Sequence, residues 1–190
     1  MAQSPKSISV FCGSSYPKSS DAEVYINDIK NLGAILGREK LLVRYGGGLY
    51  GHLKDLMESV GQAGGTMEAL ISPAYFKEDE IYPDYVSVQK LSDDIKRMKG
   101  FLKSDAYILT PGGDGTFSEA WLSHNDNLAR LFSDQSMKPL IVLNTNGFYN
   151  SIRDHFKKMA ETGYSSPDRQ KAVRFVETPE EIPGILNFGT

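Results

Sequence analysis

Short apolar runs alternate along the chain with longer segments in which apolar residues recur every three or four positions. The short runs are typical of buried strands, and the periodic segments are typical of helices that pack on one face. The segments predicted as strands are 8–12, 41–43, 67–71, 85–88, 106–109, 139–143 and 173–176. Those predicted as helices are 24–36, 50–63, 93–104, 116–132 and 148–161, followed by a capped turn at 178–181. Ser92 is expected to cap the helix at 93–104.

The order of these elements predicts the fold class. Strands that alternate with helices form βαβ units, and their right-handed crossovers make the sheet parallel. The predicted strands are apolar on both faces, as a sheet covered by helices on each side requires. No repeat, low-complexity tract or linker interrupts the 190 residues. The sequence therefore predicts one domain over residues 1–190, a doubly wound α/β fold with a mainly parallel sheet flanked by helices.

Composition and charge narrow the classes of function. An apolar fraction of 40% and a charged fraction of 24% are ordinary for a soluble globular protein. A net charge of −3 and a pI of about 5.6 argue against binding to nucleic acid or to a membrane surface, because both need a basic field. The lone Cys12 excludes an internal disulfide and indicates a reducing compartment. With no signal peptide and no apolar stretch near the ~20 residues of a membrane span, we expect a cytoplasmic protein.

Three glycine-rich segments follow predicted strands, at 12–15, 46–51 and 111–116. In a doubly wound fold, the loops after the strands meet at one edge of the sheet, where ligands bind. Glycine lets backbone N–H groups approach an anion, and the helix that follows adds its dipole. One such turn is ordinary packing, but three at the same edge favour a phosphate or nucleotide site. The pattern lacks both G-x-G-x-x-G after the first strand and a Gly-Lys-Ser/Thr ending, which disfavours nicotinamide dehydrogenases and P-loop NTPases.

Charged residues near the third glycine segment leave two interpretations open. Glu119 follows Thr116 at capping-box spacing, so it is either a helix cap or a carboxylate that acts on a ribose or a leaving group. Lys96, Arg97 and Lys99 begin the helix that leads to the strand before this segment. They form either a solvated face or a source of one cation for the ligand, for which the planar fork of arginine is best suited.

The three histidines do not form a metal-binding pattern. His52, His124 and His155 lie on different predicted helices, and one cysteine cannot supply a thiolate cage. We expect no metal site. The sequence interpretation of His124 is a pair with Asp126 on the surface of a helix.

Residues 111–119 read P-G-G-D-G-T-F-S-E and match P-G-G-x-G-T-x-x-E in full. That pattern is the hallmark of the LOG family, the "Lonely guy" cytokinin-activating enzymes and their bacterial relatives, which are often labelled possible lysine decarboxylases. The family's G-G-G-x-x-G matches 46–51, its A-G-G matches 63–65, and its opening strand and loop match 11–15. The chain thus resembles the LOG family over nearly its whole length.

The resemblance implies a Rossmann-like fold, a homodimer and an activity without a cofactor. That activity is hydrolysis of the N-glycosidic bond of a nucleoside 5′-monophosphate, such as AMP or an N6-modified AMP (a cytokinin ribotide), to free base and ribose 5-phosphate. The family's essential glutamate corresponds to Glu119. Its essential arginine corresponds to Lys96 by strict spacing, or to Arg97 after a shift of one residue, which the chemistry favours. The residues expected to bind the substrate and its phosphate are Gly13, Ser14, Gly46, Gly47, Gly48, Gly112, Gly113, Gly115 and Thr116.

The chain departs from the family pattern at several positions. Residues 52–54 are His-Leu-Lys where the family often has Leu-Met-Gly, so Lys54 replaces a glycine. Lys96 occupies the strict arginine position, Asp114 fills the variable position of the glycine loop, and Ser118 stands where many members carry a second glutamate. These departures bear on the substrate and on whether the chain turns it over.

Two other classes of function also fit parts of the sequence. Residues 112–116 resemble the G-G-D-G-T of NAD and diacylglycerol kinases, in which the aspartate would act with Mg²⁺ and ATP. Those enzymes are usually longer and add a β-rich domain. The second alternative is non-catalytic binding of a phosphorylated nucleotide-like or pterin ligand, such as the molybdenum cofactor, for which the glycine loops would look the same.

Overall fold

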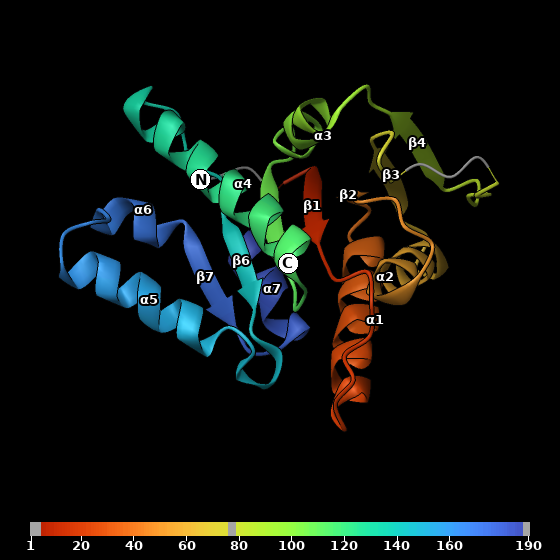
Figure 1. Ribbon diagram of the computed structural model, residues 1–190, viewed down its shortest axis with the longest axis horizontal. Helices are drawn as coiled ribbons and strands as arrows, with labels where there is room; N and C mark the ends of the chain where they lie inside the picture. Colours follow the sequence, from red (N-terminus) through yellow and green to blue (C-terminus); the bar gives the residue numbers. More distant parts are fainter. Residues whose placement is uncertain (1–4, 76–78, 188–190) are drawn as a thin grey trace.

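In the computed structural model, which describes residues 5–75 and 79–187, seven parallel strands form one sheet in the order β4-β3-β2-β1-β5-β6-β7 (Figure 1). The strands are β1 (Ser7–Phe11), β2 (Leu42–Tyr45), β3 (Thr66–Ile71), β4 (Val86–Lys90), β5 (Ala106–Leu109), β6 (Leu140–Leu143) and β7 (Val173–Val176). The α-helices are α1 (Ala22–Arg38), α2 (Gly51–Gln62), α3 (Asp94–Phe101), α4 (Asp114–Phe132), α5 (Asn150–Glu161), α6 (Pro167–Lys171) and α7 (Ile182–Leu186). Two short 3₁₀ helices, η1 (Thr145–Gly147) and η2 (Pro179–Glu181), complete the described elements.

The sheet separates two apolar cores, and β1 shows how the sequence builds both. Ile8 and Val10 pack into the core shared with α1, α2 and α7. Phe11 packs into the core shared with α3, α4 and α5. Ser9 lies on that second side, where its hydroxyl donates to the Phe101 carbonyl at 2.9 Å. Because successive strand residues face opposite sides, a strand buried on both faces must be almost continuously apolar.

The predicted fold class is confirmed, and all seven predicted strands are present with small shifts in their ends. The helix at 116–132 begins earlier than predicted, at Asp114. The helices α6 and α7 were not predicted, because segments of five residues carry too little apolar periodicity to be recognised. The expected capped turn is present as η2, where Thr178 and Glu181 form a capping box. None of the described helices is both long and apolar enough to cross a membrane.

The predicted cap of α3 is wrong by one residue. Asp93, not Ser92, is the N-cap, and its carboxylate accepts the Lys96 backbone N–H at 2.8 Å. The Ser92 hydroxyl instead donates to Asp93 at 2.7 Å. A carboxylate has two acceptor oxygens, so Asp93 can serve the helix and the serine together.

His124 is buried, which corrects its interpretation as half of a surface pair with Asp126. Only 2% of His124 is exposed, and its ring centroid lies 5.4 Å from that of Phe156 and 5.7 Å from that of Trp121. Burial, assisted by the positive charge of Arg169, lowers the pKa of His124 to about 4. The folded protein therefore holds this imidazole neutral, whereas an unfolded chain takes up its proton near pH 6.5.

This difference predicts an acid sensitivity due to His124. Between about pH 6.5 and pH 4 the unfolded state binds a proton that the folded state does not, so stability falls as the pH falls. Thermal unfolding of the wild type should lose stability between pH 7 and pH 5 more steeply than that of His124→Gln. His155→Gln, which changes an exposed histidine on α5, serves as the matched control and should keep the wild-type slope. Equal slopes for all three proteins would contradict the assignment.

Candidate active site

The loops after β1 and β5 begin at neighbouring strands in the middle of the sheet, where the order of connection reverses. In open α/β sheets, this point is where ligands bind. The two loops touch through their backbones, since a Cβ on Gly13 would lie 3.4 Å from the Gly112 Cα. Gly51, with φ of +57°, brings the start of α2 against Ser14, whose carbonyl oxygen an added Cβ would overlap. The structure thus brings the three glycine segments together, as the sequence predicts.

On the side of α3 and α4, these loops border a cavity of about 410 Å³, which we name the Arg97–Glu119 cleft. Its volume lies in the range of small-molecule sites. Side chains of both charges and backbone from all three glycine segments line it. The lining residues are Val10, Cys12, Ser14, Gly46, Gly48, Tyr50, Leu53, Tyr75, Arg97, Gly113, Asp114, Gly115, Thr116 and Glu119.

Arg97 is fixed in the cleft from several directions. Its Nε donates to the Leu70 carbonyl at 3.0 Å, and its Nη2 lies 2.7 Å from Glu119 Oε1. The guanidinium carbon lies 5.0 Å from the Phe101 ring centroid and 5.1 Å from that of Tyr75. Cation–π contacts of this kind stabilise a cation that has lost most of its water.

The structure shows which of the two candidate cations, Lys96 or Arg97, faces the cleft. Arg97 is 8% exposed and lines the cleft. The Lys96 side chain is 63% exposed, and its Nζ donates to Ser92 Oγ at 2.8 Å. Adjacent residues on a helix point about 100° apart, so only one of them can face the glycine loops. That residue is Arg97.

Glu119 does not form the capping box that was one of its two interpretations. The helix α4 begins at Asp114 with Gly113 at the N-cap, so Thr116 already lies inside the helix. The Glu119 side chain is 16% exposed and pairs with Arg97. Burial raises the pKa of the Glu119 carboxyl, the charge of Asp94 raises it further, and Arg97 acts in the opposite direction. The result is a carboxyl in contact with a cleft and able to exchange a proton nearer neutral pH than an exposed glutamate.

The residues predicted to bind phosphate occupy three kinds of position. Ser14, Gly46, Gly48, Gly113, Gly115 and Thr116 line the cleft. Gly13 and Gly112 line a neighbouring cavity instead. Gly47 lines neither cavity, and its φ of +83° and an Ile71 side chain 2.5 Å from an added Cβ require glycine. Gly47 is therefore a packing and turn position in this structure.

Some cleft residues carry no sequence signal for that role. Tyr75 reaches Arg97 from the segment after β3, and Leu53 reaches the cleft from α2. Tyr75 belongs to no motif, and Leu53 stands in the 52–54 segment where the chain departs from the family pattern. Tyr50 lies within the second glycine segment, so its position could have been inferred from that loop alone.

Cys12 lies at the wall of the cleft as a buried thiol. Burial raises its pKa well above the usual range, and the charges of Glu119 and Asp55 act in the same direction. A thiol held neutral in this way is a poor nucleophile and a poor metal ligand. Among the described residues, no group of three or more histidine, cysteine, aspartate or glutamate side chains could hold a metal ion.

Comparison with known proteins identifies the family. The family model described as "Possible lysine decarboxylase" matches residues 53–186. The chain belongs to this family, the LOG family. The matched range includes 111–119, so the G-G-D-G-T letters lie inside the LOG family's own glycine loop.

Two curated LOG relatives resemble the chain over most of its length. It is 32% identical over 177 residues to the cytokinin riboside 5′-monophosphate phosphoribohydrolase LOG3 of Arabidopsis thaliana, and the match covers 92% of this chain and 79% of that protein. It is 26% identical over 171 residues to the cytokinin riboside 5′-monophosphate phosphoribohydrolase of Rhodococcoides fascians, covering 89% of this chain and 83% of that protein.

Solved structures share the fold at lower identity. The molybdenum cofactor binding protein from Rippkaea orientalis has a TM-score of 0.65 and 17% identity, with 96% of each chain covered. The molybdenum cofactor carrier protein from Chlamydomonas reinhardtii has a TM-score of 0.62 and 16% identity, again with 96% of each chain covered. At this identity, the likeness establishes the Rossmann-like fold and nothing about the ligand.

Proposed function

We propose that this LOG-family chain hydrolyses the N-glycosidic bond of a nucleoside 5′-monophosphate, giving a free base and ribose 5-phosphate. The observation that carries the proposal is the 2.7 Å pair of Arg97 Nη2 and Glu119 Oε1 in a cleft bordered by glycine loops. The curated relatives named as phosphoribohydrolases support the same reaction class.

The phosphate would lie at the start of α4. Gly113 and Gly115 have open space where a side chain would be, so a phosphate oxygen can approach their backbone. The helix dipole favours an anion at this end. Thr116, which is buried against Gly112, adds a hydroxyl to the same region. A phosphate held here leaves the ribose to extend along the cleft toward Glu119.

The bond that breaks joins C1′ of the ribose to a nitrogen of the base. As it lengthens, positive charge develops on C1′ and on the ring oxygen, and the Glu119 carboxylate stabilises that charge. Water adds its oxygen to C1′ while Glu119 accepts one of its protons, which then passes to the departing base. Arg97 orients the Glu119 carboxylate and binds the ribose hydroxyls or assists the departure of the base.

Incubation with AMP, an N6-modified AMP and adenosine, followed by chromatography, tests this proposal. We expect free base from one or both monophosphates and much less from adenosine, which lacks the anchoring phosphate. Absence of free base from every nucleoside monophosphate tried would contradict the hydrolase proposal. Tight binding of the monophosphate without product would instead support the non-catalytic alternative.

The negative charge of Asp114 is expected to weaken substrate binding. It is the first residue of α4, and it lines the cleft beside the backbone proposed to hold the phosphate. Its charge suits the helix dipole but repels a substrate phosphate. Asp114→Asn should lower KM for AMP roughly threefold to tenfold, at a cost of about 0.5 kcal/mol in unfolding free energy. Ser118→Ala, one turn further on, should leave KM unchanged, and a raised KM in Asp114→Asn would refute the explanation.

We also propose that the chain is a homodimer. The apolar residues Ile95, Leu122 and Phe132 on α3 and α4 are 71%, 42% and 81% exposed. A second chain packed on these helices would remove apolar side chains from water, which favours association. Light scattering at micromolar concentration should give twice the chain mass of 21.0 kDa, and a value near 21.0 kDa would contradict the dimer.

A further inference from the structure

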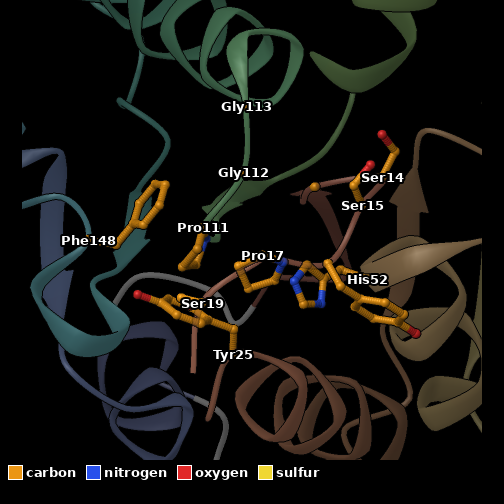
Figure 2. A pocket seen from close by; sticks show the side chains of 12 residues that line it. Ser14, Ser15, Pro17, Ser19, Tyr25, His52, Pro111, Gly112, Gly113 and Phe148 are labelled. Carbon is orange, nitrogen blue, oxygen red and sulfur yellow. The ribbon is translucent and has the colours of Figure 1, made fainter. Parts of the chain in front are cut away.

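A second cavity, of about 490 Å³, adjoins the Arg97–Glu119 cleft and shares Ser14 and Gly113 with it. It lies among the loops after β1, β5 and β6, at the reversal point of the sheet. Figure 2 shows side chains from these separate segments around one space. We name it the aromatic pocket after the rings and prolines in its wall: Tyr16, Tyr25, His52, Phe148, Pro17 and Pro111.

The rings of the aromatic pocket form two edge-to-face pairs. The Tyr25 and Phe148 centroids lie 6.1 Å apart at 78°, and those of Tyr16 and His52 lie 5.2 Å apart at 85°. Figure 2 shows Phe148 and Tyr25 on one side of the pocket and His52 on the other, with Pro17 between them. Tyr16 and Phe148 are nearly half exposed, so they leave flat apolar surface in water. A planar ring entering the pocket would cover that surface by stacking or edge contacts.

His52 gives the aromatic pocket a polar group. Its side chain is 3% exposed, and its Nδ1 has no hydrogen-bond partner among the described residues. Asp55 Oδ2, also without such a partner in the described chain, lies 3.9 Å from that nitrogen. Burial lowers the pKa of His52 while Asp55 opposes the shift, so the imidazole is neutral at pH 7. A neutral imidazole carries one donor and one acceptor, which is the complement of a nitrogen heterocycle.

We propose that the aromatic pocket is a second binding site, for a nucleobase-type ring, meaning a planar nitrogen heterocycle. Such a ring could come from a free nucleoside or from the far half of a dinucleotide. A dinucleotide can span the two cavities because Gly113 borders both of them. A phosphate on the Gly113 backbone therefore faces the aromatic pocket as well as the cleft. Neither Arg97 nor Glu119 lines the aromatic pocket, and the site goes beyond the proposed hydrolysis.

Calorimetry on the Glu119→Gln protein tests the site without turnover. With the cleft first saturated by ribose 5-phosphate, adenosine should bind with a stoichiometry of one. Phe148→Ala in the same background should weaken that binding about tenfold, as loss of an aromatic stacking partner does. Tyr164→Ala, which removes an 88% exposed ring outside the pocket, is the matched control and should bind like its parent.

A second variant tests the polar half of the pocket. His52→Leu replaces the imidazole with an apolar side chain of similar size, so it should weaken adenosine several-fold and leave naphthalene, a planar ring with neither donor nor acceptor, unchanged. Equal loss for both ligands would show a packing defect and would overturn the role of His52.

Diadenosine diphosphate, added to Glu119→Gln protein without ribose 5-phosphate, distinguishes the two sources. If diadenosine diphosphate binds at least tenfold more tightly than adenosine, and Phe148→Ala weakens that binding, the natural ligand is a dinucleotide that spans both cavities. Affinity equal to that of adenosine would assign a free nucleoside. The site is refuted if adenosine does not bind, or if Phe148→Ala leaves the binding of both ligands unchanged. Because only binding is measured, failure of AMP hydrolysis in the wild type would be a separate result.

Discussion

Glu119→Gln is expected to lower kcat for AMP hydrolysis by about 100-fold or more, while AMP still binds. Glutamine keeps the shape of the side chain and an oxygen that can accept from Arg97 Nη2, now 2.7 Å from Glu119 Oε1. It removes only the negative charge and the ability to take a proton. The melting temperature should therefore change by no more than a few degrees, because the contacts of α4 persist. Steady-state kinetics, calorimetry with AMP and thermal unfolding measure the three quantities.

A matched control for this variant is Glu161→Gln, the same chemical change at an exposed position near the end of α5. It should keep the wild-type kcat. If Glu119→Gln also bound and cleaved AMP at the wild-type rate, Glu119 would only be a partner that holds Arg97 in place.

Arg97→Met is expected to lower kcat/KM by about 100-fold or more and to reduce the free energy of unfolding by about 3 kcal/mol. The substitution keeps an unbranched apolar stem but leaves the Glu119 carboxyl in a cleft without its ion partner. It also leaves the Leu70 carbonyl without the Arg97 Nε donor. Removing one member of a largely buried pair costs more than the pair contributes, because the remaining charge stays desolvated.

Arg97→Met should also shift the pH profile of kcat in a known direction. Arg97 acts to lower the pKa of Glu119, so its removal leaves burial and Asp94 to raise that pKa further. The acid limb of the kcat profile should then move to higher pH, since the mechanism uses ionised Glu119. Lys96→Met, which removes the exposed neighbouring cation, should leave the pH profile of kcat unchanged. It should change the free energy of unfolding by no more than about 0.5 kcal/mol. Activity lost on changing Lys96 but not Arg97 would reverse the assignment.

Much of the fold was predictable because its strands are buried on both sides. Continuous apolar runs such as 106–109 and 139–143 identify parallel strands. The glycine segments that follow strands identify the edge of the sheet at which ligands bind. Glu119 was a candidate because it follows the third segment, and Arg97 because its helix leads to the strand before that segment. Their contact could not be derived from spacing, since it depends on how α3 and α4 pack on the sheet.

The errors have a common physical cause, which is that local patterns are outweighed by tertiary packing. The capping box, one of the two interpretations of Glu119, does not form because α4 extends back to Asp114 and Glu119 turns to Arg97. His124 looks like a surface residue beside Asp126, yet the aromatic rings of Trp121 and Phe156 enclose it. The aromatic pocket was not recognised either, because its rings come from segments far apart in the sequence.

The most direct test of the central proposal follows both products of AMP at once. Wild-type protein is incubated with AMP in the absence of ATP and metal, with adenine measured by chromatography and phosphorus-containing products by ³¹P NMR. The proposed reaction predicts adenine and ribose 5-phosphate in equal amounts, with no inorganic phosphate, and loss of both products in Glu119→Gln. Unchanged AMP, in a sample for which calorimetry shows that AMP is bound, would contradict the hydrolase proposal and make the chain a binding protein.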